Sequence, residues 1–237
     1  MNEEKVLDEK VVLGKLSLSD IDELKRLLRS QSIDCSDIVY MNNYFIIDKV
    51  NTNLGVSSIK RGGYRKHKII DLPLEKYRPN LCKVFLTKQS LDRKSSKKRQ
   101  KQKEPMNWES VPEEFYEYFH KGHILGYSLG NELVKGIYNK NKRLLFVQTA
   151  WSNMNSFNRN PYSQYYFEKL IEDEIRNGLN IFYESKLIYK SDNDIFPIGI
   201  NIQVKSSNEG FQMNVFLPNI DPKLTINYQN GEISNSC

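Results

Sequence analysis

Three short blocks carry the strongest structural signal in this sequence: Phe119-His120-Lys121-Gly122-His123-Ile124-Leu125-Gly126-Tyr127, Val147-Gln148-Thr149-Ala150-Trp151-Ser152-Asn153 and Gln164-Tyr165-Tyr166-Phe167-Glu168. Their side chains of chemical interest are His123, Asn153 and Glu168. This set makes a poor zinc site, but it suits magnesium, which prefers oxygen ligands and keeps several waters, so that one amide carbonyl can be its only direct protein ligand. A neutral histidine beside the ion can act as a general base near pH 7.

Each of these three residues also has an ordinary structural explanation. A histidine such as His123 can be satisfied in a core, an asparagine often lies in a turn or helix cap, and a glutamate on a helix is usually a solvated charge. Residue type and spacing leave both interpretations open. Of the other two histidines, His67 lies in a basic turn and His120 fits a core or a place beside the site.

Apolar spacing predicts two helices. The first begins near Ser19 and ends near Ser30, and it buries the face formed by Ile21, Leu24, Leu27 and Leu28. The second is expected to begin at Asn160-Pro161 and to end at about Arg176, before Asn177-Gly178. Its buried stripe is predicted to be Phe167, Leu170, Ile171 and Ile175, with Glu168 at the edge of that stripe.

Runs of alternating or continuous apolar residues predict strands near residues 44–50, 82–87, 143–147, 181–189, 199–205 and 212–217. Turn signals separate the last three, which is typical of an antiparallel meander. After His123 the chain is expected to continue in extended or turn form through Gly126 and Gly130. We expect residues 1–70 to form either a small accessory domain or the outer layer of a single fold.

The composition indicates a folded protein with a modest preference for polyanions. The chain has 237 residues, of which 39% are hydrophobic, and a formal net charge of +6. Three cysteines without metal-ligand spacing argue against a disulfide framework. No apolar run approaches the length of a membrane span, so we expect no membrane partner.

Residues 93–103 hold seven basic side chains in eleven positions. A run of this kind is either a solvated loop or a loop that grips phosphate groups. Its place just before the first block favours the second interpretation. We therefore expect substrate contacts from Lys97, Lys98, Arg99 and Lys101, and a further contact from Gln148 in the second block.

The first block resembles the Asp-Arg-Gly-His motif of the DNA/RNA non-specific endonucleases, within the His-Me finger superfamily. The second and third blocks resemble that family's next two motifs, in the same order and at similar spacing. Bacterial DNA-entry nucleases are the most similar subgroup, and the similarity covers roughly residues 77–232. This resemblance implies an α+β fold, with a ββα-metal nuclease core, a central antiparallel sheet and flanking helices.

The resemblance also implies an activity and a role for each site residue. The expected reaction is hydrolysis of phosphodiester bonds in DNA and RNA without sequence preference, by a domain spanning residues 71–237 that follows the N-terminal segment 1–70. It uses one divalent ion, Mg²⁺, with Mn²⁺ as the alternative. By residue match, His123 is the general base, Asn153 binds the metal directly, and Glu168 orients metal-bound water.

The first block departs from the family at two positions. His120 occupies the position of the family's aspartate, and Lys121 occupies that of its arginine. We expect Lys121 to take part in catalysis. Lysine keeps the positive charge but loses the two-pronged guanidinium that suits a phosphate. These changes favour a first rival interpretation, a catalytically weakened relative that only binds nucleic acid. A second rival, independent of them, is an interaction protein that works through residues 1–70 and carries the nuclease core as cargo.

The N-terminus is charged and leads into no apolar segment, so we expect no ordinary secretory signal peptide. A non-specific nuclease would damage its own cell. We therefore expect one of three situations: a cytoplasmic protein held by an inhibitor or immunity protein, export by a dedicated or non-classical route, or a sequence that is a mature or truncated form. A role as an exported toxin rests on that argument.

Overall fold

The computed structural model describes residues 18–41, 43–50, 69–71, 74–75, 78–91, 103–130, 142–154 and 160–236. In these ranges, no helix is long and apolar enough to cross a membrane. The expected substrate contacts Lys97, Lys98, Arg99 and Lys101 lie outside them.

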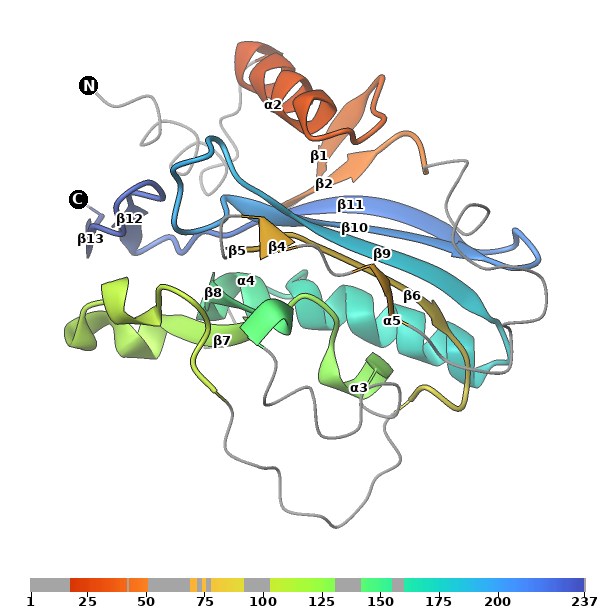
Figure 1. The fold of residues 1–237 in the computed structure, drawn as a ribbon. Coiled ribbons are helices and arrows are strands. Elements are labelled where there is room, and N and C mark those ends of the chain that lie inside the picture. The colour runs from red at the N-terminus through yellow and green to blue at the C-terminus, as the bar shows by residue number, and fades with distance from the viewer. Residues whose placement is uncertain are drawn as a thin grey trace.

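Seven strands of the described residues form one antiparallel sheet in the order β1-β2-β11-β10-β9-β6-β3 (Figure 1). Their bounds are Ile38–Met41 (β1), Tyr44–Ile47 (β2), Ile69–Asp71 (β3), Leu81–Leu86 (β6), Ile181–Ile188 (β9), Gly199–Ser206 (β10) and Gln212–Pro218 (β11). The central register places Val204 opposite both Tyr183 and Met213. The predicted antiparallel meander over residues 181–217 is confirmed.

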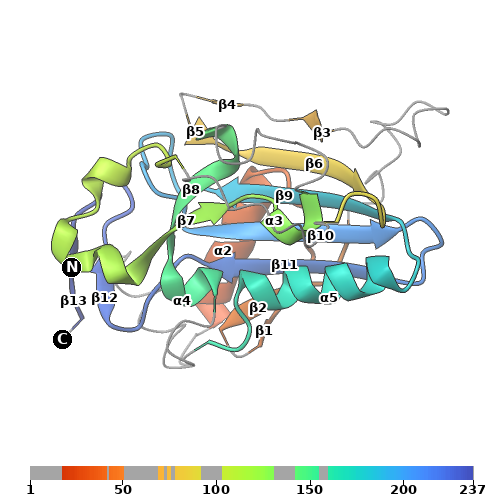
Figure 2. The same cartoon turned by 90° about the horizontal axis from the view of Figure 1, so that it is seen from below.

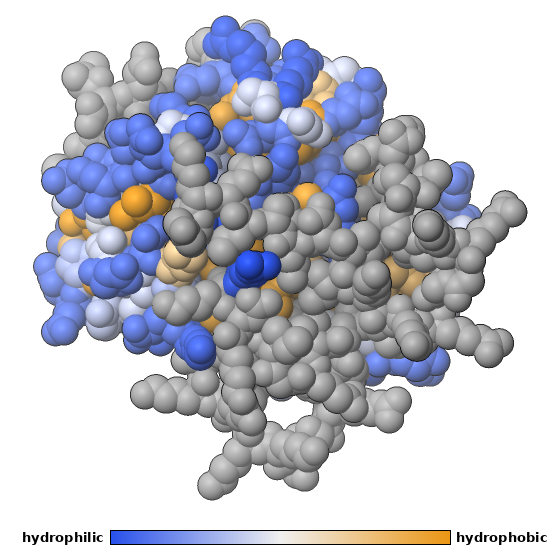
Figure 3. Space-filling model, in the orientation of Figure 1, coloured by the Kyte–Doolittle hydropathy of each residue, from blue (hydrophilic) through white to orange (hydrophobic). Residues whose placement is uncertain are grey.

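Helix α2 (Leu18–Ser30) covers one face of the sheet. Leu24 and Leu28 are buried there in a hydrophobic cluster that includes Ile188 and Phe216. The outer face of this helix is polar, and Figure 3 shows a mainly hydrophilic surface in that part of the molecule. The prediction of a helix ending near Ser30 is confirmed.

Helix α5 (Gln164–Arg176) runs along the opposite face (Figure 2). Phe167, Ile171 and Ile175 are buried against the sheet, but Leu170 is 38% exposed, so its predicted place in the buried stripe is wrong. The end of the helix agrees with the prediction, since Gly178 follows with a left-handed φ of 105°.

The predicted start of α5 at Asn160-Pro161 is wrong by a few residues. The Asn160 side chain donates to the carbonyl of Trp151 at 3.0 Å and accepts from the amide of Tyr162 at 3.1 Å. Because this asparagine forms a turn instead of a cap, the helix begins after Ser163.

Shorter elements complete the described fold. The strands among them are β4 (Leu74–Glu75), β5 (Arg78–Pro79), β7 (Phe119–His123), β8 (Leu145–Thr149), β12 (Leu224–Ile226) and β13 (Ile233–Asn235). The helices are η1 (Trp108–Ser110), η2 (Glu113–Tyr118), α3 (Tyr127–Gly130), η3 (Lys142–Leu144) and α4 (Ala150–Asn153). The segment after His123 thus contains a helical turn, α3, where extended or turn structure was expected.

The N-terminal segment shares the sheet with the rest of the chain. Strand β2 pairs with β11, so that Phe45 lies opposite Phe216 and Ile46 opposite Val215. Both phenylalanines are buried. The described part of residues 1–70 therefore contributes β1, β2 and the start of β3 to the same sheet, and its helix α2 covers one face of that sheet.

Candidate functional site

A β-hairpin and a short helix present the predicted site on the α5 side of the sheet (Figures 1 and 2). Strands β7 and β8 pair antiparallel, with His120 opposite Gln148 and His123 opposite Leu145. Helix α4 follows β8 without a break and ends at Asn153. The three sequence blocks thus become one strand, a second strand with its helix, and the first turns of α5.

Thr149 fixes the junction between β8 and α4. Its amide donates to Oδ1 of Asn219 at 2.8 Å, and its hydroxyl donates to the carbonyl of Ile220 at 2.6 Å. The same hydroxyl caps the helix by accepting from the amide of Ser152 at 3.1 Å. Trp151, only 2% exposed, packs beneath the helix. The backbone that carries Asn153 is therefore held from several directions.

Asn153 and His120 are in direct contact. Nδ2 of the amide lies 3.0 Å from Nδ1 of the imidazole. His120 is partly buried, and loss of solvation lowers the pKa of its imidazole, which favours the neutral ring. A neutral ring nitrogen can accept a hydrogen bond, so this geometry fits donation from the amide to Nδ1.

A chain of glutamines connects the second block to the third. Nε2 of Gln148 donates to Oε1 of Gln164 at 2.9 Å. Nε2 of Gln164 donates in turn to the carbonyl of His123 and to Oε1 of Glu168, both at 2.7 Å. Gln164 therefore ties the end of β7 to helix α5, and it places His123 and Glu168 around one amide.

Gln148 is 0% exposed. The predicted contact between Gln148 and substrate does not agree with this burial, because the side chain has no surface to offer. The β7 backbone is packed tightly over it: a Cβ atom on Gly122 would lie 2.3 Å from Oε1 of Gln148. A glycine at position 122 is thus required by the close approach of the buried amide.

Glu168 is 8% exposed, so it lies inside the fold and not at the edge of the helix stripe as predicted. Burial raises the pKa of its carboxyl to about 7, while hydrogen bonds from Gln164 and from the amide of Gly126 oppose that rise. A Cβ on Gly126 would lie 2.1 Å from Oε2 of Glu168. The carboxyl group is therefore enclosed between α5 and the segment that follows His123.

Lys121 lies between two partners near the start of the hairpin. Its ammonium group is 3.4 Å from Oε1 of Glu104 and 5.1 Å from the centre of the Trp108 ring. The side chain of Glu104 is 63% exposed, whereas that of Lys121 is 25% exposed. Lys121 thus holds its charge beside an exposed glutamate, with which an anion can compete.

Several residues of this arrangement were missed in the sequence. Gln164 is the most important, because it contacts both His123 and Glu168. Its spacing of four residues from Glu168 placed both on one helix face and was an available signal. Thr149 and Asn219 gave no such signal, since their contact joins positions separated by 70 residues.

One oxygen atom at this site, Oδ1 of Asn153, could bind a divalent cation. The described residues contain no group of three or more His, Cys, Asp or Glu side chains that could hold a metal ion. Within the same residues, Oδ1 of Asn153 accepts no hydrogen bond, although Nδ2 of that amide is engaged. An amide oxygen left available in this way suits an ion that keeps most of its waters.

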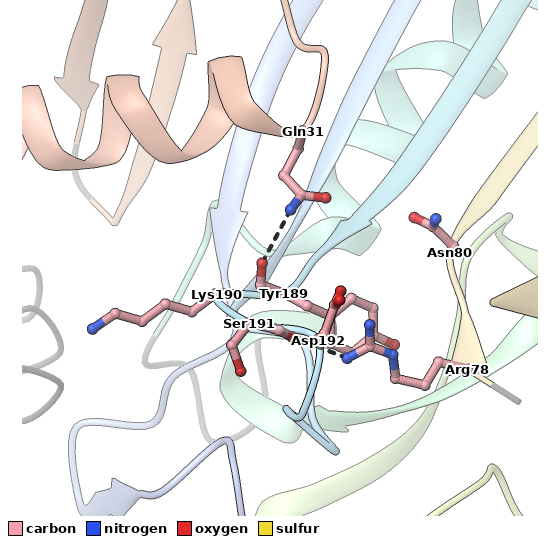
Figure 4. A pocket seen from close by; sticks show the side chains of 7 residues that line it. All are labelled: Gln31, Arg78, Asn80, Tyr189, Lys190, Ser191 and Asp192. Atoms are coloured by element: carbon pink, nitrogen blue, oxygen red, sulfur yellow. Dashed lines mark hydrogen bonds between the residues drawn. The ribbon is translucent and has the colours of Figure 1, made fainter. Parts of the chain in front are cut away.

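A separate polar pocket of about 170 Å³ lies beside the end of α2 (Figure 4). Arg78 dominates it: Nη1 donates to the carbonyls of Ser191 and Asp194 at 3.2 and 2.7 Å, and the guanidinium stacks over Tyr189. Because these contacts join β5 to the loop after β9, we assign Arg78 a structural role.

No protein-family model matches this sequence. Among solved structures, NucA from Streptococcus agalactiae crystallised with no metal bound is similar, with a TM-score of 0.71 and 22% identity over 93% of this chain and 99% of that one. NucA with a magnesium ion gives a TM-score of 0.72 and 21% identity, covering 90% and 96%. Sda1 nuclease with a bound zinc ion gives 0.60 and 17%, covering 82% and 97%.

These likenesses extend over most of each chain. The α+β class with a central antiparallel sheet, predicted from the sequence, is confirmed. The chain has the fold that NucA and Sda1 nuclease share.

Proposed function

We propose that this chain is a metal-dependent, sequence-non-specific endonuclease that hydrolyses phosphodiester bonds in DNA and RNA. The observation that carries the proposal is the junction of the β7–β8–α4 unit with α5. Within the unit His120 contacts Asn153, and Gln164 of α5 links the backbone of His123 to Glu168. This arrangement lies within a fold shared with a protein described as a nuclease. A base and oxygen donors at one hairpin suit phosphoryl transfer to water.

Asn153 is the proposed direct metal ligand, through Oδ1. The amide is neutral, so it can hold a cation without cancelling its charge. Mg²⁺ is the proposed ion, with Mn²⁺ as the alternative; NucA has been crystallised with magnesium and Sda1 nuclease with zinc. A divalent cation bound here would neutralise the negative charge that builds on the phosphoryl oxygens.

His123 is the proposed general base. As water attacks phosphorus, a new P–O bond forms and the proton of the attacking water passes to the imidazole. The bond to the leaving oxygen breaks, and this oxygen takes a proton from another water. Gln164 supports this role because its bond to the His123 carbonyl fixes the backbone at the end of β7. A positioned base of this kind typically contributes about 10²–10⁴-fold to the rate.

Glu168 and Lys121 have the supporting roles in this proposal. The Glu168 carboxyl faces Gln164 and Gly126 from inside the fold, and we assign it the orientation of water at the site. Lys121 can bind a substrate phosphate through its positive charge when the ion pair with Glu104 breaks. Contacts of this type act on the nucleic-acid backbone and read no base, so broad cleavage follows.

The test is cleavage of supercoiled plasmid DNA and of a single-stranded RNA by the purified chain, with Mg²⁺ or with EDTA. The proposal predicts nicking and RNA degradation with Mg²⁺ and neither with EDTA. His123→Ala protein prepared in parallel controls for contaminating nuclease. Binding of plasmid by gel shift without cleavage in any divalent ion would support the alternative, a catalytically weakened relative that only binds nucleic acid.

An active non-specific nuclease would endanger the cell that makes it, so the proposal requires protection. We infer export, an inhibitor protein, or both, and a toxin role is one form of the first. Expression of the wild-type chain without a partner is expected to damage host DNA, whereas His123→Ala is tolerated. Equal tolerance of both proteins would contradict this inference.

A further inference from the structure

We propose that His120 is a positioning residue: its Nδ1 accepts a hydrogen bond from the amide of Asn153 and thereby holds Oδ1 of that amide toward the metal. This inference rests on the proposed function and deepens it, because it explains how a single neutral ligand is kept in its binding orientation. The contact that carries it is the 3.0 Å approach of Nδ2 to Nδ1.

An asparagine side chain can turn either end of its amide outward. Only the oxygen end binds a cation, since the NH₂ group has no lone pair to give. The backbone of α4 is fixed by Thr149 and by the buried Trp151, so the remaining freedom lies in the side-chain torsions of Asn153. An acceptor beside Nδ2 selects the orientation in which Oδ1 stays available.

His120 is placed to be that acceptor and not a second ligand. It lies in β7 opposite Gln148, and this pairing holds its backbone against a fully buried neighbour. Its Nδ1, the nitrogen nearer the backbone, is the atom that contacts Asn153. Groups that orient a metal ligand in this way typically contribute about 10–100-fold to metal affinity.

The same geometry gives a reason for histidine where the resembling family has aspartate. Nδ1 of histidine and Oδ1 of aspartate are both two bonds beyond Cβ, so either side chain can place an acceptor at the same reach from β7. Histidine at this position therefore offers Asn153 an acceptor with the same reach as that of an aspartate. It changes the charge beside the amide but not the orientation of the ligand.

The experiment measures Mg²⁺ affinity of the full chain by isothermal titration calorimetry. His120→Phe keeps a ring of similar size and removes the acceptor, and His120→Asp restores an acceptor. We expect His120→Phe to weaken Mg²⁺ binding by about 10–100-fold and His120→Asp to bind it nearly as well as wild type. Gln31 is a partly buried polar residue in the pocket beside α2. The Gln31→Leu protein is the matched control, and we expect it to bind Mg²⁺ as wild type does.

Wild-type affinity in His120→Phe, or an equal loss in His120→Phe and His120→Asp, would overturn the inference. Asn153→Ala separates it from the proposed function. If Asn153→Ala loses Mg²⁺ binding while His120→Phe keeps it, only the positioning role fails. If wild type and Asn153→Ala bind Mg²⁺ equally, the proposed metal site itself is wrong.

A second measurement covers the case in which His120→Phe does not fold. The NMR signal of the Asn153 side-chain amide can be assigned in ¹⁵N-labelled wild type, because it is lost in Asn153→Ala. We expect the hydrogens of this amide to exchange slowly with solvent in wild type and in His120→Asp. Exchange of the wild-type signal at the rate of an exposed amide would contradict the hydrogen bond and overturn the inference.

Discussion

The ammonium group of Lys121 is expected to face a phosphate. In the structure it forms an ion pair with Glu104 and a cation–π contact with Trp108. A substrate phosphate must compete with the glutamate for this charge. Because the Glu104 side chain is largely exposed, the ion pair contributes less than about 1 kcal/mol. The contact therefore tunes substrate affinity and does not abolish it.

This competition predicts opposite effects at the two partners. Glu104→Gln is expected to lower KM for plasmid DNA by about two- to fivefold, whereas Lys121→Ala raises KM and lowers kcat/KM. Glu114→Gln, the same change at another exposed glutamate, is the control and is expected to leave KM unaltered. An identical KM in Glu104→Gln and Lys121→Ala would show that Lys121 does not meet the substrate.

The buried carboxyl of Glu168 predicts a dependence of stability on pH. Its pKa is raised from 4.5 to about 7, so as pH rises through this window the unfolded chain releases its proton first. The free energy of unfolding therefore falls with rising pH, by about 3 kcal/mol across the whole window. Glu168→Gln, which cannot ionise, is expected to lose this dependence and to lose activity.

Thermal unfolding between pH 4 and pH 8 in EDTA measures the effect. Glu172→Gln is the control on the same helix, because that carboxylate pairs with Arg176 instead of facing the site. It should retain the slope seen for wild type. A wild-type slope in Glu168→Gln would mean that the carboxyl is not held in the buried environment described.

Roles for His123, Asn153 and Glu168 could be proposed from the sequence because motif order and residue type are local properties, and these roles stay predictions. Gln148 was assigned to substrate because its burial is not local. It depends on Gln164 and on the approach of Gly122 across the hairpin. A buried amide and a substrate-binding amide look alike until the opposite strand is known.

The segment between β7 and α3 contacts helix α5 at Gly126. A side chain there would collide with Glu168, since a Cβ would lie 2.1 Å from Oε2. Gly126→Ala is therefore expected to push α5 from the hairpin, to destabilise the protein by about 1–3 kcal/mol and to reduce cleavage sharply. Gly210→Ala, where the nearest atom is 3.4 Å from the added Cβ, is the matched control.

Urea unfolding and plasmid cleavage measure both effects in one pair of proteins. Equal stability and activity in the two alanine variants would contradict the close packing of α5 on the site.

Elements with strong periodicity, such as α2 and the strands of the meander, were predicted well. The start of α5 was predicted incorrectly. Asn160 and Pro161 are residue types that often begin a helix, but the Asn160 side chain forms hydrogen bonds with Trp151 and Tyr162 instead. Local propensity was overridden by a contact with α4. The helical turn α3 was missed since four residues give no periodic signal.

The molecule joins its N-terminal segment and its candidate site through one hydrophobic cluster. Leu24 and Leu28 of α2 belong to the same cluster as Trp151 of α4, two residues before Asn153. Sequence alone left two descriptions of residues 1–70 open, because pairing between β2 and β11 joins positions far apart in the chain.

This continuity predicts a single cooperative unfolding transition. Leu28→Ala is expected to destabilise the protein by about 2–5 kcal/mol and to shift circular dichroism and tryptophan fluorescence together, because Leu28 is fully buried. Leu170→Ala on the exposed side of α5 is the control and should cost much less. A separate early transition in Leu28→Ala would indicate an independent accessory domain.

The most direct test of the central claim is a Mg²⁺ titration that follows binding and cleavage in three proteins: wild type, His123→Ala and Asn153→Ala. His123→Ala should bind Mg²⁺ like wild type and cleave plasmid about 10²–10⁴-fold more slowly, since it loses only the base. Asn153→Ala should bind Mg²⁺ weakly, with its rate partly restored at high Mg²⁺. Loss of Mg²⁺ binding in His123→Ala with normal binding in Asn153→Ala, or unchanged cleavage in both, would contradict the account.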